Sequence, residues 1–253
     1  MENLSPQTRF TGRQLVYFPV CTSTNTVAQE LVNKNEATEG CVILTSCQTA
    51  GRGQRGNTWE AASGQNLTLS VIYKPIFLAA SEQFYLNIAV SLGVSDFLKR
   101  HLPAGVLLKW PNDLYFIEKK LGGILIENSI SGNNLQSSII GIGLNVNQVF
   151  FDNPNAVSLK LITGHTYELQ PLVETLLECL EKRYLDLHKR SFYTLQQEYW
   201  HNLLGFGEYR LFEVQGKTVQ GKIVGTDEYG RLQVETGGGL QVFDLKEIRF
   251  LFE

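Results

Sequence analysis

Residues 51–59 read Gly51-Arg52-Gly53-Gln54-Arg55-Gly56-Asn57-Thr58-Trp59, and the rest of the chain is organised around them. Apolar, β-branched runs over 41–46 and 66–73 flank this stretch, which predicts a long loop between two strands. Its glycines allow a close approach of the backbone to a ligand. Its arginines offer N–H donors suited to a carboxylate or phosphate, and its tryptophan offers an apolar lid. The loop therefore predicts a flexible clamp for an anionic small molecule.

This loop has two other interpretations. Gly51, Gly53 and Gly56 match the dinucleotide-binding pattern G-x-G-x-x-G, but that pattern needs a helix to open on its third glycine. Here Ser63-Gly64 and a strand follow instead, so we reject a Rossmann fold. The plainer alternative is a solvated surface loop, although loops also concentrate function.

Length, composition and charge limit the kinds of protein that this chain can be. The chain has 253 residues, of which 43% are hydrophobic, enough for one large domain or one large and one small. The net charge of −3 predicts no overall electrostatic attraction to nucleic acid. The four cysteines and four histidines show no metal-binding spacing, and we expect the cysteines to be reduced. No signal segment or membrane-length apolar run is present, so we expect a soluble, cytoplasmic protein.

The remaining pattern predicts an α+β fold. We expect strands over 14–18, 41–46, 66–73, 106–110, 114–117, 121–127 and 137–147, and helices from about residue 24 and over 81–100, 159–163, 172–190 and 194–203. The paired hairpins over 106–147 favour a mixed, mainly antiparallel sheet with flanking helices. Short strands with Gly-rich turns after Gly205 predict a small C-terminal SH3-like β-barrel, so we divide the chain into domains 1–205 and 206–253.

Four further segments carry polar residues at element boundaries. Ser23-Thr24-Asn25 precedes a helical pattern; taken alone, these residues are best interpreted as helix caps, with ligand binding as the alternative. The others are Lys109-Trp110-Pro111-Asn112-Asp113, Lys120-Leu121-Gly122-Gly123 and the strand end Gly141-Ile142-Gly143-Leu144-Asn145. Each has a plain explanation as a turn, a hairpin or a strand end.

Together, and in this order, the five motifs resemble the biotin protein ligase family over about residues 14–252. The resemblance implies a catalytic domain of the class II synthetase-like kind followed by an SH3-like barrel. It implies a two-step reaction, in which biotin and ATP form biotinyl-5′-adenylate and a lysine of a biotin carboxyl carrier domain then receives the biotin. It also implies Mg²⁺. The match begins near the start of the chain, so we expect a short form without an N-terminal DNA-binding domain and without specific DNA binding.

The resemblance also assigns residues. It implies catalytic roles for Lys120, Arg52 and Asp113, with Asp113 also as a candidate metal ligand. The implied biotin-binding residues are Ser23, Thr24, Asn25, Gln48, Gly51, Arg52, Gly53, Gln54, Lys120, Gly122 and Gly123. The implied ATP-binding residues are Arg52, Arg55, Trp59, Lys109, Asn112, Lys120 and Asn145.

The chain departs from the family pattern in one place. Bifunctional bacterial members have arginine directly after the second glycine of the loop, where this chain has Gln54 followed by Arg55. Arg249 lies in the expected last strand but matches no nucleotide contact. The alternatives are a lipoate or octanoate ligase or transferase of the same fold, or a non-catalytic binding module. We expect no membrane association, and either a monomer or a homodimer.

Overall fold

The larger part of the molecule is built on a seven-stranded sheet. The computed structural model describes residues 4–251, apart from the side chain of Arg55. The strands are β1 Leu15–Cys21, β2 Cys41–Gln48, β3 Leu67–Tyr73, β4 Val106–Lys109, β5 Asp113–Phe116, β6 Lys119–Ser131 and β7 Asn134–Leu144, in the spatial order β1-β2-β3-β7-β6-β5-β4. Strands β1 and β2 are parallel and the other neighbours are antiparallel. The predicted mixed, mainly antiparallel α+β fold is confirmed.

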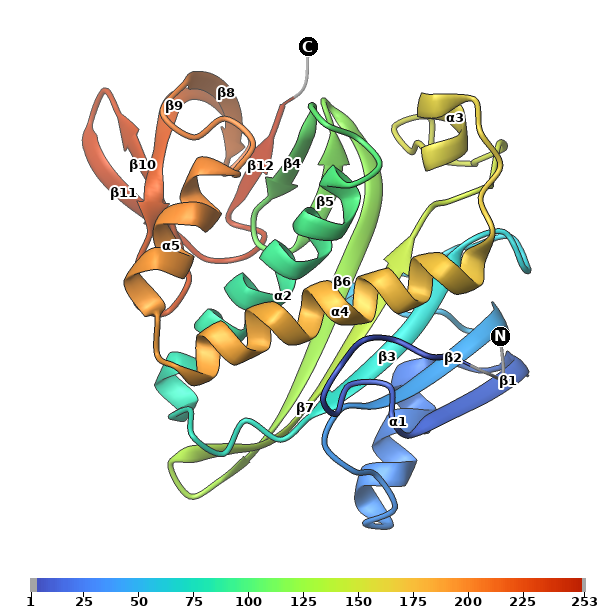
Figure 1. Ribbon diagram of the computed structural model, residues 1–253. Coiled ribbons are helices and arrows are strands. Elements are labelled where there is room, and N and C mark those ends of the chain that lie inside the picture. Colours follow the sequence, from blue (N-terminus) through green and yellow to red (C-terminus); the bar gives the residue numbers. More distant parts are fainter. Residues whose placement is uncertain (1–3, 252–253) are drawn as a thin grey trace.

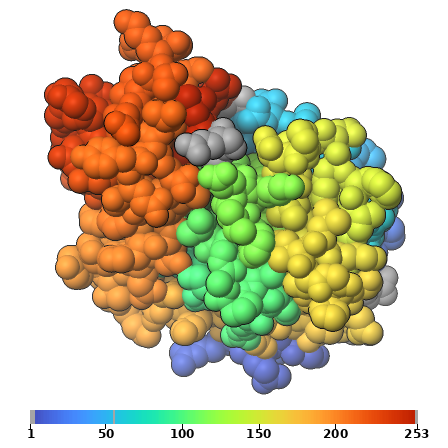
Figure 2. Space-filling view, turned by 90° about the horizontal axis from the view of Figure 1, so that it is seen from above, coloured from blue at the N-terminus to red at the C-terminus, as the bar shows by residue number. Residues whose placement is uncertain are grey.

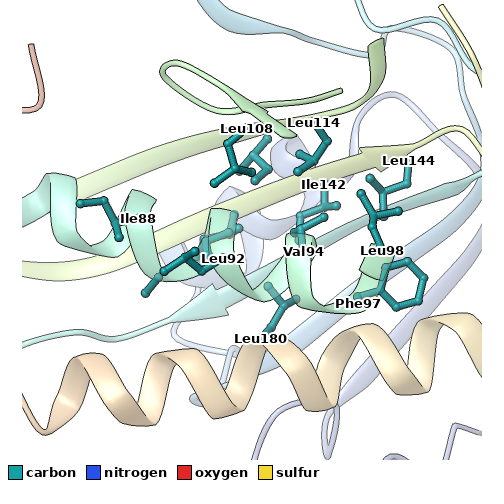
Figure 3. Close-up of a cluster of buried hydrophobic side chains, with 14 of the residues drawn as sticks. Ile88, Leu92, Val94, Phe97, Leu98, Leu108, Leu114, Ile142, Leu144 and Leu180 are labelled. Carbon is teal, nitrogen blue, oxygen red and sulfur yellow. The ribbon is translucent and has the colours of Figure 1, made fainter. Parts of the chain in front are cut away.

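Helices cover both faces of this sheet (Figure 1). The alternation along β2 shows why: Val42 and Leu44 join the main core with α2 Gln83–Lys99 and α4 Leu169–His188, while Cys41 and Ile43 pack with Ala28 of α1 Thr24–Asn33. Figure 3 shows the main core, in which Leu92 and Val94 of α2 lie between Leu180 of α4 and Ile142 of β7. The face that carries α1 has the smaller apolar cluster, which leaves room beside it for polar residues.

Several element boundaries differ from the prediction. A 3₁₀ turn over Ala80–Glu82 precedes α2, and α4 begins two residues before Pro171. Proline is tolerated there because the N–H groups of the first helical turn have no intrahelical partner. The remaining two α-helices of the described residues are α3 Leu159–Thr163 and α5 Phe192–His201. Strand β7 ends at Leu144, three residues before the predicted end.

A second, five-stranded antiparallel sheet follows α5. Its strands are β8 Tyr209–Val214, β9 Lys217–Thr226, β10 Leu232–Thr236, β11 Gly239–Phe243 and β12 Ile248–Phe250, in the order β11-β10-β9-β8-β12. Trp110 Nε1 donates a 2.8 Å hydrogen bond to the Gly230 carbonyl and so ties the two sheets together. Seen from above, the orange and red segments of this sheet lie against green segments of the first (Figure 2). A domain boundary at residue 205 stays a prediction.

Candidate active site

One cavity of about 460 Å³ collects most of the predicted site residues. Its walls come from the start of α1, the 51–59 loop, β3, β6 and β7, the segment 109–113 and the C-terminal segment 245–250. The predicted residues that line it are Ser23, Thr24, Asn25, Gln48, Arg52, Gly53, Gln54, Trp59, Lys109, Asn112, Asp113, Lys120 and Gly123. Segments that are far apart in the sequence therefore converge on one space.

The register of the sheet explains this convergence. Residues paired across neighbouring strands point to the same face, and three successive rows form the cavity side of the sheet. The first row is Lys109-Asp113-Gly123-Gly143-Thr68, the second is Leu125-Gly141-Ser70, and the third is Glu127-Ile139-Ile72. Successive rows are two residues apart along each strand, or about 7 Å. The first row carries charged residues, and the second carries Gly141 and Ser70 together with the apolar Leu125.

The second row supports a neutral polar network. Gln48 Oε1 accepts hydrogen bonds from the backbone N–H of Thr24 (2.8 Å) and from its hydroxyl (3.2 Å). Ser70 Oγ lies 2.7 Å from Thr24 Oγ1 and 2.6 Å from Asn25 Oδ1. A side chain at Gly141 would collide with the Asn25 amide, because an added Cβ would lie 2.4 Å from Asn25 Oδ1. The absence of a side chain at Gly141 therefore gives Asn25 its place beside the cavity.

The interpretation of Ser23-Thr24-Asn25 as helix caps alone does not fit their geometry, and their predicted ligand-binding role stays a prediction. Ser23 occupies the N-cap position, but its side chain makes no capping hydrogen bond. All three residues are almost fully buried, with 3% of each exposed, and all three line the cavity. Buried polar side chains need partners, and here the network and the cavity provide them.

The first row carries an ion pair at the cavity wall. Lys120 Nζ lies 2.8 Å from Asp113 Oδ1, and the side chains are 28% and 25% exposed. A β-bulge opposite Leu114 and Tyr115 aims Lys120 out of the regular register. Its backbone is held from the other side, since Lys120 N–H donates to the Asn155 carbonyl (2.7 Å) and the Lys120 carbonyl accepts from Val157 N–H (2.9 Å). The ammonium group is therefore held by Asp113, on a backbone that the segment 155–157 fixes from the other side.

Lys109, which pairs with Asp113 in the first row, adds a second cation beside this ion pair. Its Nζ lies 5.5 Å from the ring centroid of Tyr115 and 5.1 Å from that of Phe250, which belongs to the second sheet. Burial lowers the pKa of Lys109, Asp113 opposes that shift, and the charge on Lys120 adds to it. The cavity thus concentrates positive charge, which favours an anionic ligand.

The 51–59 loop folds back on itself as a small hairpin. Arg52 and Thr58 form an isolated antiparallel bridge around a 3₁₀ turn over Gln54–Gly56, and no helix opens on Gly56. The rejection of a Rossmann fold is confirmed. The Trp59 ring packs on Gly143, where an added Cβ would lie 2.4 Å from the indole. Its Nε1 is buried without a partner among the described residues, so a ligand acceptor can satisfy it.

Four predicted residues lie elsewhere or are not described. Gly122 faces away from the cavity, where an added Cβ would lie 2.4 Å from Leu144 Cδ2, because only one of two adjacent strand residues can point to each face. Gly51 does not line the cavity and packs against the Trp59 carbonyl and the Gln48 amide. Asn145 is 3% exposed and donates to the Val157 carbonyl (3.1 Å). The Arg55 side chain lies outside the described residues.

Asn145 also keeps an unused acceptor. Its Oδ1 is buried without a hydrogen-bond partner in the part of the chain that the structure describes, and the residue does not line the cavity. The predicted ATP-binding role of Asn145 therefore stays a prediction.

Several residues of the site lie outside the five sequence motifs. The alternation along β3 and β6 could have indicated Thr68, Ser70 and Glu127, since each shares a face with a motif residue. Lys246 and Arg249 line the cavity from the second sheet, so Arg249 does lie at the site although it matched no motif. Their placement depends on how the two sheets pack, which no sequence pattern indicates.

The site offers little for a metal by itself. Within residues 4–251, no three His, Cys, Asp or Glu side chains gather to hold an ion. Asp113 supplies one carboxylate in the cation-rich row. That fits an ion such as Mg²⁺, which usually binds through one or two carboxylates, substrate phosphates and water.

Comparison with known proteins agrees with this geometry. Residues 17–145 match the model of the biotin/lipoate A/B protein ligase family, and residues 212–245 match that of the biotin protein ligase C terminal domain. The chain is 34% identical to the bifunctional ligase/repressor BirA of Bacillus subtilis, covering 93% of this chain and 73% of that protein. It is 30% identical to the biotin--[acetyl-CoA-carboxylase] ligase of Mycobacterium tuberculosis, covering 79% and 75%.

The fold of the chain is also similar to that of solved biotin protein ligases. The biotin protein ligase from Aquifex aeolicus in complex with biotin and ATP has a TM-score of 0.78 and 26% identity, covering 95% of this chain and 100% of that one. A helix long and apolar enough to cross a membrane is not found among the described residues. The fold, the ordered motifs and the match over half of the chain lead to one conclusion: the chain belongs to the biotin/lipoate A/B protein ligase family.

Proposed function

We propose that the protein is an ATP-dependent biotin protein ligase, which forms biotinyl-5′-adenylate and transfers the biotin to a lysine of a biotin carboxyl carrier domain. The observation that carries this proposal is a single cavity with a neutral polar network in its second row and two lysines beside a carboxylate in its first. A ligand with an uncharged polar head and an anionic tail fits this arrangement. The similarity of the chain to proteins named as biotin ligases supports the same activity.

The second row suits the ureido ring of biotin. That ring carries N–H donors and a carbonyl acceptor, and Thr24, Asn25 and Gln48 offer both kinds of partner. Leu125 lines the cavity in the same row and provides apolar contact for the thiophane ring and valeryl chain. The head would then lie about 7 Å from the charged row, which places the carboxylate toward Lys120.

The charged row suits the first chemical step. A carboxylate oxygen of biotin attacks the α-phosphorus of ATP, a P–O bond breaks and pyrophosphate leaves. Negative charge develops on the α-phosphate, and preorganised cations lower the barrier most where that charge grows. Lys120 is held for this role by its ion pair and its two backbone hydrogen bonds. Lys109 adds charge from the same row, and Arg52 lines the same cavity.

The second step transfers the acyl group. The amine of the carrier lysine attacks the acyl carbon, the bond to the phosphate oxygen breaks and AMP leaves. The amine must lose a proton, and the Asp113 carboxylate is the acceptor nearest to Lys120 in the cavity wall. We assign Asp113 to accept a hydrogen bond from the attacking amine.

Mg²⁺ belongs to this proposal as a partner of the phosphates. Asp113 is the residue that would hold it, together with phosphate oxygens and water. When bound, the ion neutralises phosphate charge and favours the departure of pyrophosphate.

Biotin-dependent ATP–pyrophosphate exchange tests the proposal. The protein should exchange labelled pyrophosphate into ATP only with biotin present, and a mass spectrum should show biotinyl-adenylate retained by the protein. A purified biotin carrier domain should then gain one biotin. Exchange that depends on lipoate or octanoate instead would assign the alternative acyl ligase, and the absence of any exchange would favour a binding module. The absence of specific DNA binding stays a prediction from the net charge of −3.

A further inference from the structure

A carboxylate outside the charged row links two parts of the cavity. Glu127 lies in the third row, and its Oε2 accepts hydrogen bonds from Asn25 Nδ2 (2.7 Å) and Arg52 Nη2 (3.0 Å). Asn25 belongs to the polar network, whereas Arg52 belongs to the 51–59 loop. A single oxygen therefore joins the loop to the polar network.

This contact holds Arg52 away from the charged row. Glu127 follows Gly123 by four positions along β6, a distance of about 13 Å at ~3.3 Å per residue. Gly123 lies beside the ion pair, since an added Cβ there would lie 3.2 Å from Asp113 Oδ1 and 3.6 Å from Lys120 Nζ. Arg52 must therefore leave Glu127 before it can approach an anion bound beside Lys120.

The same carboxylate orients the Asn25 amide. Nδ2 donates to Glu127, and Oδ1 lies 2.6 Å from the Ser70 hydroxyl. Turning the amide over would bring Oδ1 against the negative carboxylate, which is unfavourable. The charge on Glu127 thus determines which atoms of Asn25 the cavity presents.

We propose that Glu127 is a positioning residue, which orients Asn25 and holds Arg52 in the ligand-free protein until the anion of the ligand competes for the Arg52 guanidinium. The pair is open to such exchange, because 46% of the Arg52 side chain and 36% of the Glu127 side chain are exposed. Exposed ion pairs contribute little to stability, so a second anion can displace one partner. The nature of the anion rests on the proposed function, whereas the contact itself does not.

The test compares Glu127→Gln with Glu60→Gln. Glu60 is an exposed residue just after the loop, and no hydrogen bond or ion pair joins it to the described residues. Binding of biotin and of biotinol, its uncharged alcohol analogue, is measured by calorimetry for both variants and the parent. We define the preference for biotin as the Kd of biotinol divided by the Kd of biotin. Loss of the competing carboxylate in Glu127→Gln should raise this ratio roughly two- to fivefold, because only biotin carries the anion. Glu60→Gln should keep the preference of the parent.

Limited proteolysis without ligand provides the second measurement. Release of Arg52 should speed cleavage within residues 51–58 in Glu127→Gln relative to the parent and to Glu60→Gln. An unchanged preference for biotin over biotinol, or an equal change in both variants, overturns the proposal. If the parent binds neither compound, the proposed function fails, and proteolysis alone then tests the contact between Glu127 and Arg52. Faster cleavage in Glu127→Gln than in the parent supports this contact, and equal cleavage overturns it.

Discussion

Replacing Lys120 by alanine tests the proposed chemistry most directly. The ammonium group lies 2.8 Å from Asp113, and both side chains are about three-quarters buried, with 28% and 25% exposed. A preorganised cation of this kind contributes about 2.7–4 kcal/mol to the transition state, so adenylation should slow by about a hundred- to a thousandfold. We expect the effect chiefly on kcat, because the polar network that we assign to the biotin head is unchanged.

The cost in stability should be much smaller. Partly exposed ion pairs contribute up to about 1 kcal/mol, which corresponds to a Tm shift of about 2–4 °C for a chain of this size. Pyrophosphate exchange at saturating biotin and ATP measures the rate, and thermal unfolding measures stability. The large loss of rate with a small loss of stability separates a catalytic role from a structural one.

The neighbouring residue provides a matched control. Lys119 is exposed and does not line the cavity, so Lys119→Ala removes the same charge one position away. Its exchange rate should stay close to that of the parent. Near-normal exchange in Lys120→Ala, or an equal loss in both variants, would refute the role assigned to Lys120.

Three further predictions concern other parts of the molecule. Gly143→Val should weaken binding of biotinyl-adenylate in calorimetry by displacing Trp59, since even an added Cβ would lie 2.4 Å from its ring. Burial lowers the pKa of Lys109, so its charge is lost at a lower pH than that of an ordinary lysine. The rate of pyrophosphate exchange should therefore decline on the alkaline side of the pH profile, and Lys109→Arg should extend activity to higher pH. Burial alone would raise the pKa of Glu181, but N–H donors of residues 9–11 outweigh burial and lower it. Its carboxylate should therefore stabilise the fold at neutral pH and lose that effect as the pH falls through its lowered pKa, so that Glu181→Gln costs about 1–3 kcal/mol in urea unfolding at pH 7 and less in acid.

The element pattern and the five motifs were predictable because they depend on local periodicity and short spacing. The hairpins over 106–147 and the loop at 51–59 lie where hydrophobic alternation and glycines predict them. The end of β7 was not predictable in this way. The Asn145 N–H still bonds to Leu121 of β6, but the Asn145 carbonyl accepts from Leu159 N–H at the start of α3, and the strand ends there.

The composition of the site needed the register of the sheet. Lys109, Asp113 and Gly123 share a face only because their strands pair in one particular alignment, which the bulge opposite Leu114 alters for Lys120. Gly122 and Gly123 share one sequence motif, but strand alternation points Gly122 to the face opposite the cavity. Such alignments follow from tertiary packing, which a local pattern does not determine.

The wall contributed by residues 245–250 has a consequence for synthesis of the protein. Ser23 leaves the ribosome more than 220 residues before Phe250, an interval of roughly 10–45 s at ~5–20 residues per second. During that time the first sheet can pair and bury its core, while the cavity is still open on the side that β12 will cover. A nascent chain at this stage has its lysine–aspartate pair and its polar network but not the complete enclosure. On the proposed function, the protein therefore becomes able to retain a reactive intermediate only late in translation, well after most of the residues that we assign to catalysis have been made.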